Sequence, residues 1–136
     1  MDCLFCKIIN NEIPAEKIFE DEAFVAFLDI KPNNPGHALL VPKKHTDTLL
    51  LTGDAELQEL IVRAPKIARA IGEALDYEAF NFIVNNGRAA GQVIDHLHLH
   101  IIPRRDGDGL EHFKNRKYEE GEIESVGEKI RAAFHG

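Results

Sequence analysis

The chain has 136 residues, of which 44% are hydrophobic and 29% charged, and its formal net charge is −7. A chain of this length most simply forms one domain with its own core, and its acidic balance disfavours general nucleic-acid binding while still allowing a small anion in a local pocket. We expect no membrane span, since no apolar run approaches roughly 18 residues, and a cytoplasmic location, since the N-terminus lacks the basic and apolar regions of a signal peptide.

The first 42 residues predict a short helix followed by three strands. Residues 3–11 carry two cysteines and a partial apolar stripe, which indicates a helical turn that Pro14 ends. A hairpin turn is expected at Asp21-Glu22, and a loop dense in turn residues at 29–36. The three predicted strands cover residues 16–20, 23–28 and 37–42.

A long amphipathic helix is predicted from Asp54 to about Leu75. Its apolar residues recur at i, i+3 and i+4 spacing, and Asp54 supplies N-cap chemistry. Pro65 lies inside the pattern and predicts a kink or a break there. The rest of the chain predicts two strands, over residues 80–85 and 95–102, then a charged, solvated stretch over 111–121 and a closing helix over 123–134.

Short strands combined with one long helix predict an α+β fold, in which a small antiparallel sheet carries a helix on one face. The sequence contains no internal repeat and no interdomain linker. We therefore expect a single domain over residues 1–136, with a core of about residues 3–110 and a C-terminal tail with a helix over residues 111–136.

Three of the seven histidines, His96, His98 and His100, fall within five residues and alternate with apolar residues. In an extended strand, side chains two residues apart point to the same face, so the spacing predicts a row of imidazoles on one face and a leucine-rich core face opposite. A glycine-containing turn over residues 85–92 precedes the row and has backbone N–H groups to offer an anion.

Three uses of such a row are open. The histidines either lie on the solvent-facing side of a strand without a specific function, or bind one metal together, or each have a different role. Along an extended strand the Cα atoms of His96 and His100 lie roughly 13–14 Å apart, whereas a zinc–nitrogen bond is about 2.0–2.1 Å. A single site for all three histidines is therefore disfavoured, unless the strand is kinked.

Different roles for the three histidines would suit a reaction in which one of them attacks a phosphorus atom. A neutral imidazole attacks phosphorus well, and the resulting phosphoramidate splits one displacement into two easier ones. Preorganised N–H donors suit the negative oxygens of such a substrate. Gln92 adds an amide that both donates and accepts hydrogen bonds.

Cys3 and Cys6 have the C-x₂-C spacing of half a zinc site. With His45 and His96 they would form a closed Cys₂His₂ structural site, pinning the N-terminal turn to the sheet. Two free core thiols are the alternative. A redox pair is disfavoured, because no βαβ pattern surrounds the cysteines.

Two polar residues at strand ends are further candidates. His37 is either a polar strand-start residue or an orienting partner for the histidine cluster. Asp29 is either a loop-initiating residue or an acceptor for ribose hydroxyls. We assign no role to His112 or His135, and the basic pair Arg104-Arg105 is more typical of surface than of phosphate binding.

The stretch His96-Leu97-His98-Leu99-His100-Ile101-Ile102 resembles the histidine-triad motif of the HIT superfamily. Further similar motifs occur in the same order from Cys3 to about Leu110, and together they resemble a short, cysteine-bearing member of the Hint branch. These motifs are Phe5-Cys6-Lys7-Ile8-Ile9, Ile13-Pro14, Phe19-Glu20-Asp21-Glu22, Phe27-Leu28-Asp29-Ile30, Gly36-His37, Val41-Pro42-Lys43-Lys44-His45 and Asn85-Asn86-Gly87.

The resemblance implies a five-stranded antiparallel sheet with helices, commonly paired into a homodimer by the long helix and a strand. It implies a nucleotide hydrolase or transferase acting on a purine nucleoside 5′-phosphoryl compound, an AMP or GMP derivative. The implied nucleophile is His98, with catalytic support from His100 and His37. The implied substrate-binding residues are Asp29 at the ribose and Asn85, Gln92 and His100 at the phosphate; the implied ligands of a structural zinc are Cys3, Cys6, His45 and His96.

The chain departs from the Hint branch at two points. Val93 stands where a hydroxyl residue often follows the glutamine, and the tail has no Trp. The resemblance therefore does not predict which leaving group the substrate has. Two other functions therefore stay open: a dinucleoside polyphosphate hydrolase, and a nucleotide- or metal-binding interaction protein without physiological turnover.

Overall fold

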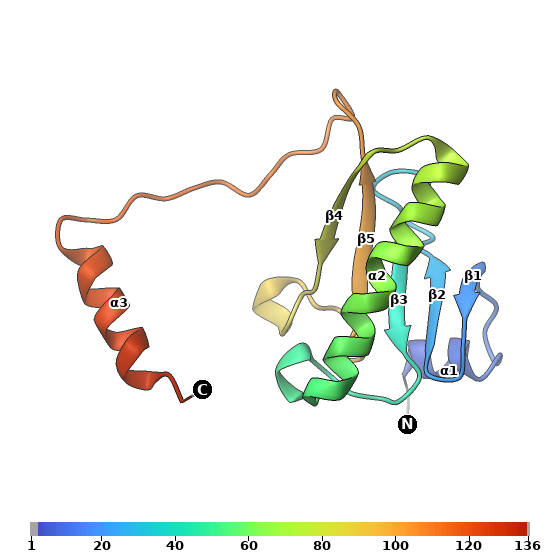
Figure 1. Ribbon diagram of the computed structural model, residues 1–136, viewed down its shortest axis with the longest axis horizontal. Coiled ribbons are helices and arrows are strands. Elements are labelled where there is room, and N and C mark those ends of the chain that lie inside the picture. The colour runs from blue at the N-terminus through green and yellow to red at the C-terminus, as the bar shows by residue number, and fades with distance from the viewer. Residues whose placement is uncertain (1–2, 136) are drawn as a thin grey trace.

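The structure, a computed structural model, describes residues 3–135 and has the predicted α+β architecture. One antiparallel sheet of five strands has the order β1-β2-β3-β5-β4, so β1 and β4 are its two edges (Figure 1). The strands are β1 (Lys17–Glu20), β2 (Phe24–Leu28), β3 (Ala38–Pro42), β4 (Ala79–Ile83) and β5 (Leu99–Arg104); the helices are α1 (Leu4–Ile9), α2 (Asp54–Leu75) and α3 (Glu122–Ala133), with 3₁₀ turns η1 (Leu49–Leu51) and η2 (Arg88–Ala90).

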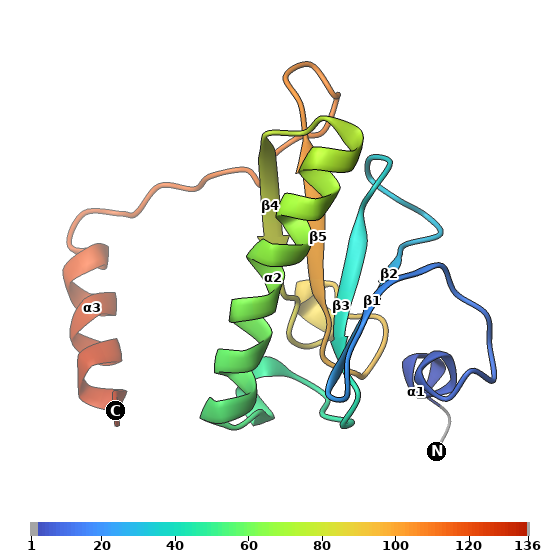
Figure 2. The same cartoon turned by 45° about the vertical axis from the view of Figure 1, so that its right-hand side comes forward.

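Helices cover both faces of the central strands. The apolar stripe of α2 packs on one face, and α1 packs on the opposite face, as Figure 2 shows. Strand β3 is buried along its whole length because both of its faces are covered. On the α2 face the core includes Phe24, Leu40, Leu60, Ala64, Ile67, Leu99 and Ile101; on the α1 face it includes Phe5, Ile8, Val25, Phe27, Leu39 and Val41.

Helix α2 runs without a break through Pro65. Its neighbours Ala64, Ile67 and Ala68 are buried against the sheet, and this packing holds the helix together across the missing backbone donor. The predicted N-cap is wrong by one residue: Gly53 is the cap and Asp54 the first helical residue, so its carboxylate lies where the helix dipole favours negative charge.

The fifth strand is shorter than predicted, because it begins at Leu99 rather than near Asp95. Pairing with β3 reaches only from Leu40 opposite Leu99 to Ala38 opposite Ile101. Residues 94–96 form a bend, and the Leu97 N–H donates instead to the Thr46 carbonyl, 2.7 Å away. The predicted alternation nevertheless holds, since Leu97, Leu99 and Ile101 all lie in the α2-side core.

Gly36 lets the loop between β2 and β3 approach the end of α2. Its φ is +95°, and a Cβ there would lie 2.8 Å from the side chain of Leu75, so a larger residue would be both strained and crowded. The same loop is tied down by the Tyr77 hydroxyl, which donates to the Pro35 carbonyl. This anchoring places His37, which directly precedes β3.

After β5 the chain extends away from the sheet to α3. Figures 1 and 2 both show α3 standing beyond the β4 edge, clear of the rest of the molecule. Among the described residues no helix is long and apolar enough to cross a membrane.

Candidate functional site

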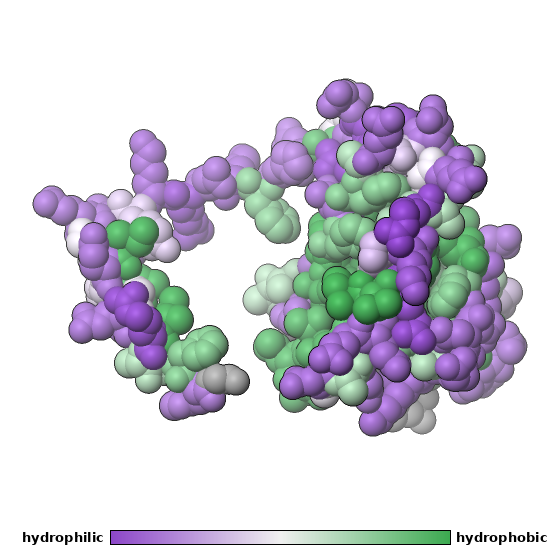
Figure 3. Space-filling view, in the orientation of Figure 1, coloured by the Kyte–Doolittle hydropathy of each residue, from purple (hydrophilic) through white to green (hydrophobic). Residues whose placement is uncertain are grey.

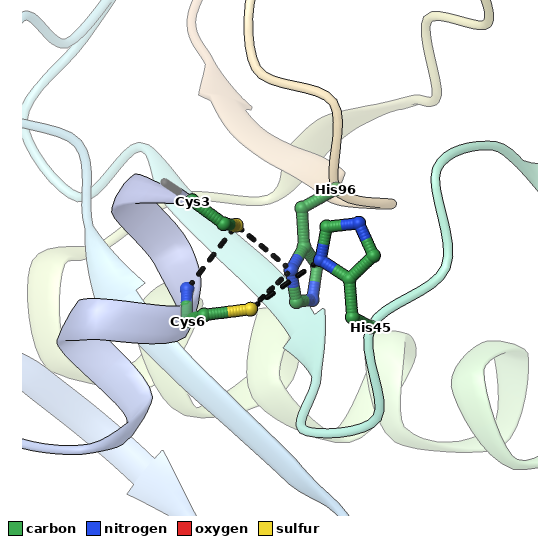
Figure 4. A group of neighbouring side chains, drawn as sticks. All are labelled: Cys3, Cys6, His45 and His96. Carbon is green, nitrogen blue, oxygen red and sulfur yellow. Dashed lines mark hydrogen bonds between the residues drawn. The ribbon is translucent and has the colours of Figure 1, made fainter. Parts of the chain in front are cut away.

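The four residues predicted to bind a metal lie together. Cys3 and Cys6 come from the first turn of α1, His45 from the loop after β3, and His96 from the segment before β5 (Figure 4). Their ligand atoms all lie within 4.8 Å of one another. The two sulfurs share one side because the C-x₂-C spacing spans one helical turn, and Cys3 caps that turn by accepting from the Cys6 N–H.

The distances fit a tetrahedral zinc site. Bond lengths of about 2.3 Å to sulfur and 2.0–2.1 Å to nitrogen place tetrahedral S and N ligands roughly 3.5 Å apart. The Cys3 Sγ lies 3.4 Å from the Nδ1 of His96, and the Cys6 Sγ lies 3.3 Å from the Nδ1 of His45 and 3.5 Å from that of His96. The residues present therefore match the dimensions that zinc requires.

Outer hydrogen bonds orient both imidazoles for metal binding. The Nε2–H of His96 donates to the Pro42 carbonyl at 2.8 Å, and the Nε2–H of His45 donates to the Asp47 carboxylate, also at 2.8 Å. Both partners leave Nδ1 unprotonated and aimed at the sulfurs, as expected for histidine ligands.

The Cys6 thiol is poorly placed for ionisation on its own. Burial, with the neighbouring Cys3, raises the pKa of Cys6 to about 11. A divalent cation among the four side chains would reverse this effect by stabilising the thiolate. The donor set therefore fits a cation.

His98 presents one free nitrogen to the site. Its Nδ1–H donates to the His96 carbonyl at 2.7 Å, which assigns the lone pair to Nε2. The ring packs edge-on against Phe5, with the ring centroids 5.0 Å apart, and its centroid lies 5.0 Å from that of His100. His98 is thus a buried imidazole of fixed tautomer and orientation.

His37 and His100 form a directed pair. The backbone N–H of Asn33 donates to the Nδ1 of His37, so His37 carries its proton on Nε2 and donates it to the Nδ1 of His100, 2.9 Å away. Because the Nδ1 of His100 accepts this hydrogen bond, the neutral ring of His100 carries its proton on Nε2. The cluster therefore combines a lone pair on His98 with a neighbouring N–H donor on His100.

Burial keeps this cluster neutral near pH 7. It is the main cause that lowers the pKa of His37 and of His98 below the ordinary value of 6.5. Burial, together with repulsion from protonated His98 and His37, lowers the pKa of His100 to about 4. Neutral imidazoles retain the lone pair that a nucleophile needs.

Asp29 and Asn85 lie at the ends of strands near the histidines. The Oδ2 of Asp29 is 3.7 Å from the Nε2 of His37, while its Oδ1 accepts from the Lys31 N–H. Asn85 follows β4, whose Ile83 pairs with His100. Extending this antiparallel register by two residues brings Asn85 level with His98.

The turn before the triad uses most of its polar groups internally. The Gln92 side chain accepts from the Gly87 N–H and donates to the carbonyls of Asp47 and Ile94. The N–H groups of Ala90, Gly91 and Gln92 also bond within the turn. In this conformation the side-chain amide of Gln92 stabilises the turn through these hydrogen bonds. A contact between Gln92 and a phosphate stays a prediction.

Sequence reasoning missed the groups that orient the histidines. Three of them act through backbone atoms or packing, namely Asn33, Pro42 and Phe5, and no side-chain pattern signals them. Asp47 was detectable, because a carboxylate two residues after a candidate ligand histidine is a common outer partner.

The comparisons with known proteins agree with this geometry. The sequence matches the HIT domain over residues 10–107. An uncharacterized HIT-like protein of Methanocaldococcus jannaschii is 50% identical over 107 residues, which cover 79% of this chain and 82% of that protein. An adenylylsulfatase of Arabidopsis thaliana is 46% identical over 80% of this chain and 55% of its own length. An adenosine 5′-monophosphoramidase of Schizosaccharomyces pombe is 41% identical over 76% of this chain and 75% of its own length.

Solved structures share the whole fold. A HIT family protein from Bacillus subtilis superposes with a TM-score of 0.89 at 36% identity, covering 100% of this chain and 99% of that one. A Zn-bound histidine triad family protein from Mycobacterium smegmatis superposes with a TM-score of 0.78 at 36% identity, covering 98% and 99%. Because the HIT domain matches well over half of the chain's length, the chain belongs to the HIT family.

Proposed function

We propose that this protein is a nucleotide hydrolase or transferase that acts on the α-phosphate of a nucleoside 5′-phosphoryl compound through a nucleotidyl adduct on His98. One observation carries the proposal. The Nδ1–H of His98 is held by the His96 carbonyl, which leaves a neutral Nε2 beside the N–H-donating pair His37–His100.

In the first step the Nε2 of His98 forms a bond to phosphorus, while the bond from phosphorus to the leaving group breaks. The leaving group departs with the bonding electron pair and takes up a proton. In the second step water, or another acceptor, attacks phosphorus and releases His98. The Nε2–H of His100 donates to a phosphoryl oxygen, where negative charge develops.

The names of two relatives support the substrate class in this proposal. Their names describe hydrolysis of an adenylyl sulfate and of an adenosine 5′-monophosphoramidate. We assign a phosphoramidate or acyl derivative of AMP or GMP to this chain, with Asp29 at the ribose hydroxyls and Asn85 at the phosphate. The functional unit in this proposal is a homodimer.

We assign structural zinc to the Cys3, Cys6, His45 and His96 group. Four protein ligands close a tetrahedral shell and leave no open position for substrate, and one similar solved structure is described as Zn-bound. The ion would link α1 to the sheet, and through α1 it would support Phe5 against His98.

Replacing the nucleophile tests the proposal. We expect His98→Asn to lower turnover of an adenosine phosphoramidate at least about 10³-fold, as removal of a nucleophile does in other enzymes, while AMP still binds. The matched control is His135→Asn, which alters an exposed histidine beyond α3 and should leave turnover unchanged. Mass spectrometry of briefly reacted wild-type protein should detect a nucleotidyl group on His98.

Undiminished turnover in His98→Asn would contradict the proposal. Nucleotide binding with no turnover of any phosphoramidate or acyl nucleotide by the wild type would indicate a binding protein instead. Faster hydrolysis of a diadenosine polyphosphate than of the phosphoramidate would indicate a dinucleoside polyphosphate hydrolase.

A further inference from the structure

Helix α3 has an apolar face that no other part of the described chain, residues 3–135, covers. Ile123, Val126 and Ile130 recur at the spacing of one helical face, yet no residue of α3 is buried. Ile123 is 55% exposed and Ile130 is 59% exposed. Figure 3 shows apolar surface gathered on the side of α3 that faces the rest of the molecule. An amphipathic helix of 12 residues is stable only when such a face is packed.

A groove of matching character lies between α2 and the edge strand β1. Its volume is about 730 Å³, and α2 contributes to it from Val62 to Leu75. That stretch is roughly 20 Å long at 1.5 Å per residue, and α3 is about 18 Å long. The apolar residues that line the groove are Ile18, Phe19, Leu28, Val62, Ile67, Ala70, Ile71, Ala74 and Leu75.

One cation at the border of the groove can pair with carboxylates of α3. Arg63 of α2 is already paired with Asp21, which also lines the groove, whereas Lys66 of α2 is exposed. Helix α3 carries Glu122, Glu124 and Glu128 towards its start and Lys129 and Arg131 towards its end. Opposite charges at the border of an apolar contact favour the intended orientation.

The C-terminal arm, residues 111–135 with α3, extends in a direction that points to the groove of another copy. The arm leaves β5 on the side of β4, whereas the groove borders β1 at the opposite edge of the sheet. Figures 1 and 2 both show α3 beyond β4, on the side of the sheet away from β1. Residues 111–136 are about a fifth of the chain, so full-length superposition on the Bacillus subtilis structure with a TM-score of 0.89 requires the arm to superpose as well.

We propose that α3 of one copy docks into the α2–β1 groove of a second copy, and that the exchange is reciprocal. The apolar face of each α3 is then covered, and the extended arm crosses from one body to the other. The exchange explains why a helix with a strong apolar face stands apart from its own core.

A pair of substitutions on α3 tests the docking. Ile130→Asp places a charge on the apolar face, and Ala132→Asp places the same charge on the opposite face of the helix. We expect Ile130→Asp to raise the dimer dissociation constant, measured by sedimentation, at least about 30-fold, the effect of losing a central interface residue. Ala132→Asp should leave it within about threefold. A monomeric wild type, or equal effects of the two substitutions, would overturn the proposal.

Cysteine cross-linking identifies whose groove is filled. One chain carries Ala70→Cys in the groove, another carries Ile130→Cys on α3, and the two are mixed and oxidised, with each single variant and the wild type oxidised alone as controls. We expect two-chain cross-links in the mixture and not in the controls. A monomeric, internally cross-linked product from the Ala70→Cys/Ile130→Cys double variant would show docking on the chain's own groove and overturn the exchange, as would the absence of any cross-link.

Discussion

Hydrogen-bond partners decide which nitrogen each histidine presents. Residues His96, His98 and His100 are chemically identical, yet their partners differ. The Pro42 carbonyl leaves the Nδ1 of His96 facing the two cysteines, and the His96 carbonyl leaves the lone pair of His98 on Nε2. The proposed difference in role between these histidines therefore rests on tautomers that their hydrogen-bond partners assign.

At the same scale, the lowered pKa of His100 predicts a pH dependence of stability. Its pKa is about 4 in the folded protein, where it is surrounded by His37, His98 and Asp29, against an ordinary 6.5. Between these values the unfolded chain binds a proton that the folded chain does not. The free energy of unfolding should therefore fall as the pH drops from 6.5 towards 4, by up to about 1.4 kcal/mol per pH unit for this group.

Urea unfolding of the wild type and of His100→Gln across pH 4–7 measures this contribution. We expect a shallower pH dependence in the variant, because Gln does not titrate. His37, whose pKa is also lowered by burial, keeps its share of the slope in both proteins. Identical slopes would show that His100 is not protonated differently in the two states.

Asp29 carries a second prediction at the residue scale. Asp29→Asn keeps the Oδ1 that accepts from the Lys31 N–H but removes the charge available to ribose hydroxyls. We expect KM for a ribonucleotide substrate to rise about tenfold or more, the value of a hydrogen bond to a charged group. The wild type should prefer the ribonucleotide over its 2′-deoxy analogue, and the variant should lose most of that preference. An unchanged preference would remove Asp29 from the ribose site.

At the scale of elements, the C-x₂-C turn links a six-residue helix to the sheet. Such a short helix is not stable by itself, and α1 is held by Phe5 and Ile8 in the core and by the Cys–His group. The same helix supports His98 through Phe5. The Cys–His group and the cluster of His37, His98 and His100 are thus neighbours that share one supporting element.

The Cys3→Ser/Cys6→Ser variant tests this link. We expect the purified variant to lose its zinc, measured by elemental analysis, and to unfold more than about 5 °C below the wild type, because several kcal/mol of metal-linked stability are removed. Residual turnover should persist below the new unfolding temperature, since His98 is unchanged. One full equivalent of zinc in the variant would contradict the ligand assignment.

At the scale of the whole molecule, the body and the arm are separable. Among the described residues, the buried apolar side chains all belong to the segment between Cys3 and Pro103, and α3 contributes none of them. A chain ending after Phe113 should therefore still unfold cooperatively, with a circular dichroism spectrum that loses only the contribution of α3. Loss of cooperative unfolding in this truncated chain would mean that the arm is part of the core.

Local patterns were sufficient for most of the elements. The i, i+3, i+4 stripe predicted α2 to its last residue, and alternation predicted which side chains of residues 97–101 enter the core. The start of β5 was not predictable from residues 95–102, because the β3–β5 pairing stops where Leu40 lies opposite Leu99 and the Leu97 N–H donates instead to the Thr46 carbonyl, a group distant in the sequence. Pro65 predicted a kink or a break, yet the helix continues through it, because packing against the sheet outweighs the cost of the backbone hydrogen bond that proline removes.

The sequence by itself determined which residue types meet at the site. The C-x₂-C spacing and the alternating histidines are encoded within a few residues, and strand and helix periods translate them directly into shared faces. Only the tertiary structure decided which nitrogen each histidine presents. The atoms that choose between Nδ1 and Nε2 come from other segments, such as the Asn33 N–H for His37 and the Pro42 carbonyl for His96, and contacts between distant segments form only when the chain folds.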